Sequence, residues 1–521
     1  MLQNVAENHS ENPALSSSNR HMSYRELAAN AAGFGKALLE RDIRKGERVA
    51  LYLPNFPEFV IAYYGALWVG AVVVAISPLY KERELLRVLS DSEAEAIVCW
   101  GRLLPLIDAI REKTRLRHVF RVSGLGAKLQ PTLAPDDESL QEDMNTILAK
   151  TSPLPRPVEI QPRIDLALLQ YTGGTTGVPK GAMLTHYNLV VNAVQFSTWL
   201  GMKSGEVHLA ALPLFHIYGM TTTMNAPICT AGRIVLIPDP GDTDSILHAV
   251  NQFKPNIFCG VPTMYQRLIS HPNIREFNLR SIRVCVSGAS SLAPQVQTRF
   301  EELTGGRLVE GYGLTEASPV THVNPLDKHE KNRAGSIGIP ISDTDARIVD
   351  SESGSTSLPP GVAGELIIRG PQAMKGYWGD SVETGKVLRD GWLHTGDIGL
   401  MDEEGYIKFL GRNKELIKCS GYSVFPTEIE NLLYRHPAVA EAAVIGVPDA
   451  YRGESPKAFI VLKPEYRGKI KEEEMIDWSK ENMAAYKRPR ILEFTEELPK
   501  NAAGKVLKRI LAEEGQGGRS K

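Results

Sequence analysis

Short apolar runs alternate with amphipathic stretches along the first 400 residues of the chain. The apolar runs have the length and β-branched content of buried strands, while the amphipathic stretches repeat apolar residues at helical spacing. The predicted strands include 48–53, 95–100, 233–237, 257–260 and 284–287, and the predicted helices include 24–39 and 294–303. This alternation predicts a mostly parallel sheet with helices on both faces.

Glycine-rich or polar segments follow four of the apolar runs, at Thr172, Gly260, Ser287 and Gly311. Ligands of open α/β sheets bind at the carboxyl ends of the strands. We therefore expect these four loops to converge on one cleft.

The pattern changes after Gly335. Short alternating runs separated by turns predict strands at 346–349, 364–369, 391–400 and 406–410, which together form a β-rich lobe. The sequence from 412 to 521 then has the length of a small domain. Its pattern predicts a helix at 428–435, strands at 439–448 and 457–462, a helix at 472–483 and a strand at 490–494.

One uncharged stretch, 59–80, is long enough to span a bilayer. Gly65 and Gly70 interrupt it, and Val72–Ile76 is a β-branched run followed by Pro78. A buried helix, a turn at Gly70 and a buried strand account for this pattern, so no membrane span is predicted. A peripheral contact with a membrane is not excluded.

Composition describes an ordinary globular protein of several domains. The chain has 521 residues, 43% hydrophobic and 23% charged, and its net charge of −2 disfavours a nucleic-acid partner. Five scattered cysteines without a C-x-x-C motif fit neither a disulfide framework nor a zinc site, and they favour a reducing, cytoplasmic location. Composition leaves a monomer and a homodimer equally open.

Residues 171–186 contain the most informative motif, Tyr-Thr-Gly-Gly-Thr-Thr-Gly-Val-Pro-Lys-Gly-Ala-Met-Leu-Thr-His. Glycines let backbone amides approach anionic oxygens, hydroxyls add hydrogen bonds and a lysine adds charge, so the motif suits a polyphosphate. It is not a Walker A loop, because Gly181 follows the lysine where that motif has Ser or Thr. The residues predicted to bind phosphate are Thr172, Gly173, Gly174, Thr175, Thr176, Gly177 and Lys180.

This string resembles the phosphate loop of the adenylate-forming superfamily, which includes acyl-CoA synthetases, firefly-type luciferases and peptide-synthetase adenylation domains. The resemblance covers nearly the whole chain and implies an α/β fold. A large N-terminal domain, 1–411, would hold two αβα sheets and a β-rich lobe at about 335–411. A small mobile α+β lid, 412–521, would turn about a hinge at Lys414.

A second motif, Glu310-Gly311-Tyr312-Gly313-Leu314-Thr315-Glu316, follows the predicted strand 307–309. An aromatic ring can stack on a purine, a hydroxyl can bind a phosphate, and a carboxylate can hold Mg²⁺. The string matches the family's Tyr-Gly-x-Thr-Glu core. The match implies nucleotide contacts from 310–313, catalytic roles for Thr315 and Glu316, and Mg²⁺ ligands at Glu316 and Thr175.

Two further nucleotide contacts follow from the resemblance. Asp397, in Trp392-Leu393-His394-Thr395-Gly396-Asp397, matches the acid that binds both ribose hydroxyls, and Arg412 matches the second ribose contact. Gly288 and Ala289 would lie against the adenine and the carboxyl group.

The C-terminal region carries a lysine-centred motif and a hinge motif. Lys505 ends Leu498-Pro499-Lys500-Asn501-Ala502-Ala503-Gly504-Lys505 and matches the catalytic lysine that bridges the attacking carboxylate and the α-phosphate, although Ala503 replaces the usual Thr. In 412–421, Lys414 matches the pivot. By the same resemblance, the residues along the CoA thiol tunnel are Lys418, Ser420 and Gly421.

The segment 213–219 resembles the motif that lines the acyl site. It implies His216 as a gate near the carboxylate, with Phe215, Tyr218, Gly219 and Met264 in the acyl pocket. Glycines at 219, 288, 311 and 313 are expected to leave an open channel. That expectation favours medium- or long-chain fatty acids over aryl acids.

The resulting hypothesis is an AMP-forming acyl-CoA ligase that uses ATP, Mg²⁺ and CoA. The acid and ATP would give acyl-AMP, and CoA would then displace AMP. A 4-coumarate-like aryl-acid ligase is the nearest alternative. A luciferase-type oxygenase and a stand-alone peptide-synthetase adenylation enzyme share the same motifs.

Overall fold

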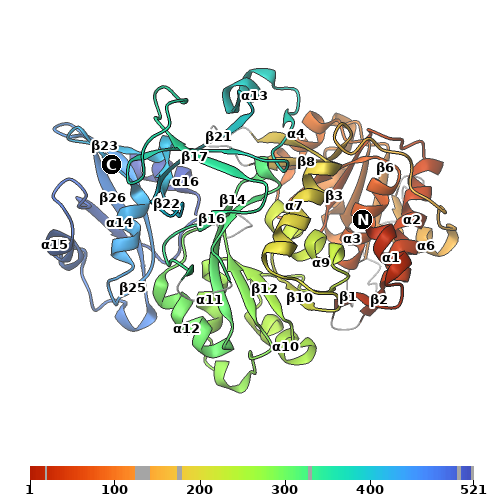
Figure 1. Cartoon of the computed structure of the whole chain (residues 1–521), viewed down its shortest axis with the longest axis horizontal. Coiled ribbons are helices and arrows are strands. Elements are labelled where there is room, and N and C mark those ends of the chain that lie inside the picture. The colour runs from red at the N-terminus through yellow and green to blue at the C-terminus, as the bar shows by residue number, and fades with distance from the viewer. Residues whose placement is uncertain (18–19, 124–140, 173–178, 327–330, 501–505, 518–521) are drawn as a thin grey trace.

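The computed structural model describes residues 1–17, 20–123, 141–172, 179–326, 331–500 and 506–517. Figure 1 shows an elongated molecule with the N-terminal sheet at one end and the C-terminal unit, in blue, at the other. No helix in these described ranges is long and apolar enough to cross a membrane.

The first sheet contains eight strands within the described residues, in the order β19-β9-β8-β4-β3-β5-β6-β7. The run from β8 to β7 is parallel, whereas β9 and β19 add antiparallel pairings at one edge. The strands are β3 (Arg48–Tyr52), β4 (Val72–Ala75), β5 (Ala96–Trp100), β6 (His118–Val122), β7 (Gln141–Asp143), β8 (Leu166–Thr172), β9 (Lys180–Thr185) and β19 (Gly376–Tyr377). Helices α2 and α3 share the core of one face and α4 and α5 that of the other, so the predicted layering is confirmed.

Two of the described helices around this sheet, α2 and α6, begin at a residue whose side chain caps the helix. Ser23 caps α2 by accepting from the amide of Glu26 at 3.2 Å, while Glu26 accepts from the amide of Ser23 at 2.7 Å. The stretch 59–80 forms a helix, a turn at Gly70 (φ 71°) and a strand, as predicted. The helices are α1 (Leu2–Asn8), α2 (Tyr24–Glu40), α3 (Pro57–Trp68), α4 (Glu82–Ser92), α5 (Leu104–Asp108) and α6 (Met144–Lys150).

The second sheet has nine strands within the described residues, in the order β16-β15-β14-β13-β12-β10-β11-β1-β2. Its central strands are parallel. The strands are β1 (Pro13–Ser17), β2 (Arg20–Ser23), β10 (Val207–Ala210), β11 (Arg233–Leu236), β12 (Ile257–Gly260), β13 (Val284–Ser287), β14 (Arg307–Gly313), β15 (Val320–Val323) and β16 (Ile339–Pro340).

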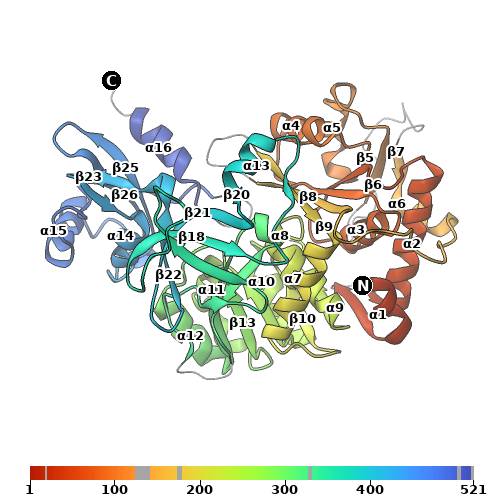
Figure 2. The ribbon, with the colours of Figure 1, turned by 45° about the horizontal axis from the view of Figure 1, so that its top comes forward.

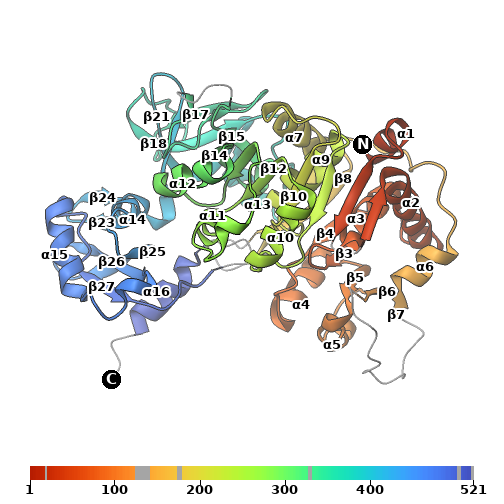
Figure 3. The ribbon, with the colours of Figure 1, turned by 90° about the horizontal axis from the view of Figure 1, so that it is seen from below.

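Helices cover both faces of this sheet. The view in Figure 3 shows α10, α11 and α12 in front of the strands, and α7 and α9 share the core of the opposite face. The helices are α7 (His186–Trp199), α8 (Ile217–Gly219), α9 (Ala226–Cys229), α10 (Thr243–Phe253), α11 (Pro262–Ile269) and α12 (Pro294–Thr304), with a π-helix at Met220–Asn225.

The β-rich lobe is an antiparallel sheet that Figure 2 shows above the nine-stranded sheet. It consists of β17 (Asp345–Val349), β18 (Ala363–Arg369), α13 (Ser381–Val387), β20 (Leu388–Arg389), β21 (Trp392–Met401) and β22 (Ile407–Arg412). All four strands predicted for this region are present.

The C-terminal unit begins directly after β22 and packs α14 against that strand. Its elements are β23 (Ile417–Cys419), β24 (Tyr422–Val424), α14 (Pro426–Leu433), β25 (Val439–Asp449), β26 (Gly453–Leu462), α15 (Glu472–Asn482), β27 (Ile491–Phe494) and α16 (Lys508–Gly517). The predicted order of helices and strands is confirmed, and the β23–β24 hairpin is an addition that periodicity did not reveal. The exact domain boundary at 411 and 412 stays a prediction.

Candidate active site

The predicted phosphate loop falls between two strands, β8 and β9, that pair antiparallel. Thr172 ends β8 and pairs with Lys180, the first residue of β9. The predicted phosphate ligands Gly173, Gly174, Thr175, Thr176 and Gly177 lie outside the described residues. The strand β9 that follows also distinguishes this segment from a Walker A loop, in which a helix follows.

Lys180 already has charged and aromatic neighbours. Its ammonium group forms an ion pair with Glu383 of α13 and lies 5.4 Å from the ring centroid of Tyr377. A phosphate that reaches this lysine must therefore compete with the Glu383 carboxylate.

Glu316 is held in a fixed position by groups from the region around β19. Its Oε1 accepts a hydrogen bond of 2.7 Å from the hydroxyl of Tyr377, and its backbone carbonyl accepts one of 2.7 Å from the amide of Met374. Burial, together with the Glu316 carboxylate, raises the pKa of Tyr377 above its usual value, so the phenol stays a donor at neutral pH. Thr315 precedes Glu316 in the same 3₁₀ turn, Thr315–Ala317.

Glu316 offers one carboxylate that could bind a magnesium ion together with substrate oxygens. The part of the chain that the structure describes holds no group of three or more His, Cys, Asp or Glu side chains that could hold a metal. Mg²⁺ is commonly bound by one or two carboxylates together with phosphate oxygens and water. Glu316 therefore has the right chemistry to share such an ion with a nucleotide.

Tyr312, Asp397 and Arg412 come together from distant parts of the sequence. The Tyr312 hydroxyl donates to Asp397 Oδ2 at 2.5 Å, and Arg412 Nε lies 3.4 Å from Asp397 Oδ1. Asp397 and Arg412 are register partners on β21 and β22. Burial alone would lower the pKa of Arg412, but the carboxylates of Asp397 and Glu415 outweigh it, and the pKa lies above its usual value. The structure thus brings a ring, a carboxylate and a guanidinium side by side, and their binding of one nucleoside stays a prediction.

Glu310 is the buried acid of this site. Glu310 is the last residue of β14 that pairs with the parallel strand β13, and its register partner there is Ser287. Burial raises the pKa of Glu310 to about 8, although a hydrogen bond from the amide of Leu292 works in the opposite direction. Glu310 is therefore mostly a neutral acid at pH 7 and can donate a hydrogen bond.

The loop after β13 has a backbone strain that is typical of functional sites. Ala289 is exposed and has φ 69°, a left-handed conformation that disfavours residues with a Cβ. Gly288 before it is buried and packs against the ring of Tyr218. Gly260 ends β12 and Ser287 ends β13, the next strand of the same sheet. Gly311 lies near the end of β14, on the other side of β13, whereas Thr172 ends a strand of the other sheet.

The predicted acyl residues surround a well-filled region. Tyr218 donates to the carbonyls of Val286 at 2.9 Å and Gly260 at 3.2 Å, which anchors its ring across the ends of two strands. Met264 is buried in the same core cluster. His216 is the N-cap of α8 and accepts from the amide of Tyr218 at 3.2 Å, while the Phe215 carbonyl accepts from Gln170 of β8 at 3.2 Å. That last bond joins β8 to the segment between β10 and α8.

The expectation that four glycines leave an open channel is wrong. A Cβ at Gly219 would lie 2.3 Å from the carbonyl oxygen of Pro213, and one at Gly313 would lie 2.2 Å from that of Pro319. At Gly288 it would lie 3.0 Å from the Tyr218 ring, and at Gly311 it would lie 3.1 Å from a Val286 methyl group. These glycines allow close packing, because protein atoms fill the space beside each of them.

The predicted CoA residues lie at the tip of the β23–β24 hairpin. Lys418, Ser420 and Gly421 are exposed, and the amide of Ser420 donates to the carbonyl of Arg452 in the same unit. Positive φ at both Ser420 (53°) and Gly421 (81°) is typical of a tight hairpin turn. Their role at a CoA tunnel stays a prediction.

The predicted pivot Lys414 lies in the 3₁₀ turn Asn413–Glu415, two residues after the end of β22. Lys505 lies outside the described residues. Its neighbours in the sequence are engaged within the C-terminal unit, because Lys500 pairs with Glu441 at 2.6 Å and Lys508 with Glu430 at 2.8 Å.

Two residues of the site had not been recognised from the sequence, Tyr377 and Glu383. Both follow the Met374-Lys375-Gly376 segment, and neither belongs to a motif that by itself indicates phosphate chemistry. Only the pairing of β19 with β9 brings them to Lys180.

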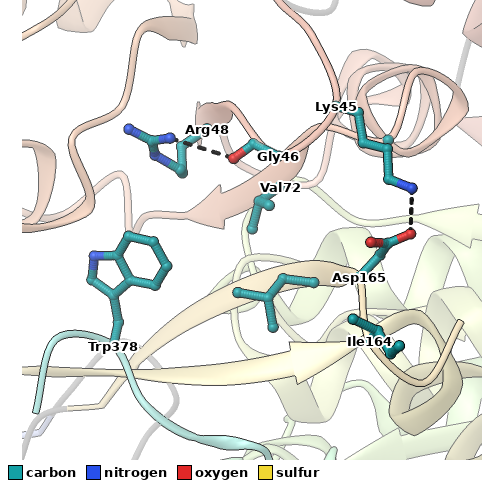
Figure 4. A pocket seen from close by; sticks show the side chains of 9 residues that line it. Lys45, Gly46, Arg48, Val72, Ile164, Asp165 and Trp378 are labelled. Carbon is teal, nitrogen blue, oxygen red and sulfur yellow. Dashed lines mark hydrogen bonds and ion pairs between the residues drawn. The ribbon is translucent and has the colours of Figure 1, made fainter. Parts of the chain in front are cut away.

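A separate cavity of about 160 Å³ lies beside the first sheet, away from the strand ends described above (Figure 4). Trp378 forms one wall, and Lys45 and Arg48 contribute the charges. Lys45 pairs with Asp165 at 2.6 Å, and Arg48 donates to the carbonyls of Ser92 and Glu93. The charge of Lys45 is therefore already neutralised, and the guanidinium of Arg48 already has hydrogen-bond acceptors.

Comparison with known proteins agrees with this geometry. The family model "AMP-binding enzyme" matches residues 2–378, and "AMP-binding enzyme C-terminal domain" matches residues 428–505. The chain therefore belongs to the AMP-binding enzyme family, as the motifs predicted.

Individual relatives include ligases for different acids. A long-chain-fatty-acid–CoA ligase of Bacillus subtilis (strain 168) is 42% identical, over 96% of this chain and 91% of that protein. A feruloyl-CoA synthase of Amycolatopsis sp is 36% identical, over 94% and 92% of the two chains. The solved structure of an anthranilate CoA ligase in complex with anthranoyl-AMP superposes with a TM-score of 0.89 at 30% identity, covering 98% of this chain and 96% of that one.

Proposed function

We propose that this protein is an AMP-forming acyl-CoA ligase that activates a medium- or long-chain fatty acid, with long-chain acids as the first choice. The cluster of Tyr312, Asp397 and Arg412 carries the proposal, because it offers a ring to the adenine and charged groups to the ribose. The 42% identity to a long-chain-fatty-acid–CoA ligase supports the choice of acid.

In the first half-reaction, the fatty carboxylate attacks the α-phosphorus of ATP and pyrophosphate leaves. The phosphate loop and Lys180 would hold the triphosphate, and Lys505 would neutralise charge that grows on the attacking and α-phosphate oxygens. Glu316, fixed by Tyr377, would hold Mg²⁺ together with phosphate oxygens, and the bound ion would supply charge neutralisation for the leaving pyrophosphate.

In the second half-reaction, the thiol of CoA attacks the acyl carbonyl carbon and AMP leaves. The hairpin residues Lys418, Ser420 and Gly421 are exposed on the C-terminal unit in the present arrangement. A rotation of that unit about Lys414 would bring them to the acyl-AMP. Such lid movements commonly separate the steps of a two-step enzyme.

The aryl-acid alternative is supported by the 36% identity to a feruloyl-CoA synthase and by the likeness to the solved anthranilate CoA ligase. The packing at the four glycines also removes the open channel that had favoured a fatty chain. The two hypotheses name different acid substrates, but both describe the same two-step reaction through an acyl-AMP.

A substrate screen tests both. Pyrophosphate release and CoA-thioester formation should be measured with saturated acids of 6 to 18 carbons, ferulate and anthranilate, at fixed ATP, CoA and Mg²⁺. We expect the highest kcat/KM for a long-chain acid. A preference for an aryl acid would support the alternative, and pyrophosphate release without thioester would contradict CoA ligation.

A further inference from the structure

Tyr377 connects the two charged groups at the phosphate end of the site. Tyr377 is 9% exposed and lies on β19. This two-residue strand pairs with β9, one of the two strands that flank the predicted phosphate loop and form the phosphate hairpin, β8–β9. The Tyr377 hydroxyl donates to Glu316 Oε1 at 2.7 Å, and its ring lies beneath the Lys180 ammonium group, 5.4 Å from the centroid. One side chain therefore touches both a carboxylate suited to a metal and a cation suited to a phosphate.

The backbone around Tyr377 is fixed on both sides. Its amide donates to the hydroxyl of Thr384 at 2.8 Å, and that hydroxyl donates to the carbonyl of Asp380 at 2.7 Å. Gly376 has φ 142°, and a Cβ there would lie 2.7 Å from the Thr384 methyl carbon. Helix α13 is thus locked to β19, and the Tyr377 ring has little freedom to move.

A rigid phenol that donates to one carboxylate oxygen determines where the other oxygen points. Hydrogen bonds to charged acceptors are stronger than neutral ones, and supporting groups that orient a metal-binding carboxylate strongly affect metal affinity. A cation above an aromatic face is likewise held by the ring.

We propose that Tyr377 is a positioning residue that fixes Glu316 for a divalent cation through its hydroxyl and Lys180 for the triphosphate through its ring. This inference rests on the proposed function, because it assumes that Mg·ATP binds between these groups. Tyr377 itself need not touch the reacting atoms.

The hydroxyl and the ring can be tested separately. Tyr377→Phe removes only the hydroxyl, and Tyr377→Leu removes the ring as well. Calorimetric titration should measure the Kd of ATP with Mg²⁺ and with EDTA for each variant. For Tyr377→Phe we expect about tenfold weaker Mg·ATP binding and little change in metal-free ATP binding. For Tyr377→Leu we expect metal-free ATP binding to weaken also, by about threefold.

Tyr24→Phe is the matched control. That tyrosine is fully buried and donates to the carbonyl of Gly232 at 2.6 Å, far from the phosphate hairpin. It should leave both Kd values unchanged. Thermal unfolding of all variants shows whether a lost affinity merely reflects a lost fold.

A double-mutant cycle with Glu316→Gln decides whether Tyr377 acts through Glu316. We expect Tyr377→Phe to have almost no further effect on Mg·ATP binding once Glu316 is changed. Additive effects, or equal weakening with and without Mg²⁺ in Tyr377→Phe, would overturn the proposal. The proposed function would fail if no acid in the screen were activated. The ATP-binding measurement would still test the role of Tyr377 in that case.

Discussion

Lys180 at the start of β9 forms an ion pair with Glu383 of α13, 203 residues further along the chain. The same carboxylate also accepts from Lys386, one turn along α13. Hydrogen bonds from Lys180 and then Lys386 lower the pKa of Glu383 to about 2, so it is ionised at any physiological pH. The lysine that we propose to bind the triphosphate is therefore already paired with a carboxylate in this structure.

Replacing Glu383 with Gln should make ATP binding easier. ATP must displace Glu383 from Lys180, and a partly exposed pair of this kind is weak, so we expect KM for ATP to fall about two- to fivefold with kcat unchanged. Initial rates at varied ATP measure this. Glu302→Gln, which breaks the surface pair with Arg299, is the control. An unchanged or higher KM in Glu383→Gln would show that the pair does not compete with ATP.

Glu310 should make the protein less stable as pH rises. Burial raises its pKa from 4.5 to about 8, so between these values the folded protein binds more protons than the unfolded chain. The contribution to stability is fully present below pH 4.5 and is lost as pH rises through about 8, with a slope approaching about 1.4 kcal/mol per pH unit. Denaturant midpoints of wild type and Glu310→Gln should be compared from pH 5 to pH 9. Their difference should change steadily across this window, and parallel profiles would contradict the buried-acid interpretation.

Replacing Lys505 with Ala should abolish acyl-adenylate formation and largely spare thioester formation from preformed acyl-AMP. Positive charge is needed between the attacking carboxylate and the α-phosphate only in the first step. Pyrophosphate exchange and thioester formation measure the two steps separately. Lys500→Ala is the matched control, because Lys500 is paired with Glu441. Near-normal exchange in Lys505→Ala would show that the role is wrongly assigned.

Lys414→Pro tests the hinge. Proline locks φ near −65° and removes the amide hydrogen, so the C-terminal unit should be trapped in one orientation. We expect adenylation within about tenfold of wild type, a barrier change of about 1.4 kcal/mol, and a much larger loss of CoA transfer. Lys414→Ala keeps the backbone free and should leave both steps close to normal. Equal losses in both steps would place the pivot elsewhere.

The sequence by itself predicted most strands and helices, because periodicity and turn chemistry are local properties of the chain. It also identified Tyr312, Asp397 and Arg412 as members of one site, since each lies in a motif whose residue types match nucleotide chemistry. A hydrogen bond and an ion pair bring these three residues together in the structure, and their role in binding a nucleotide stays a prediction.

Only the tertiary structure showed what surrounds these residues. The pairing of β19 with β9 places Tyr377 and Glu383 beside Lys180, across about 200 residues of sequence, and no local pattern encodes that pairing. Glycines illustrate the same limit. Their number suggested open space beside the acyl site, but whether space is open depends on which atoms the fold brings there, and at Gly288 these belong to the Tyr218 ring. Local sequence determines which groups are available, and long-range packing determines which of them meet.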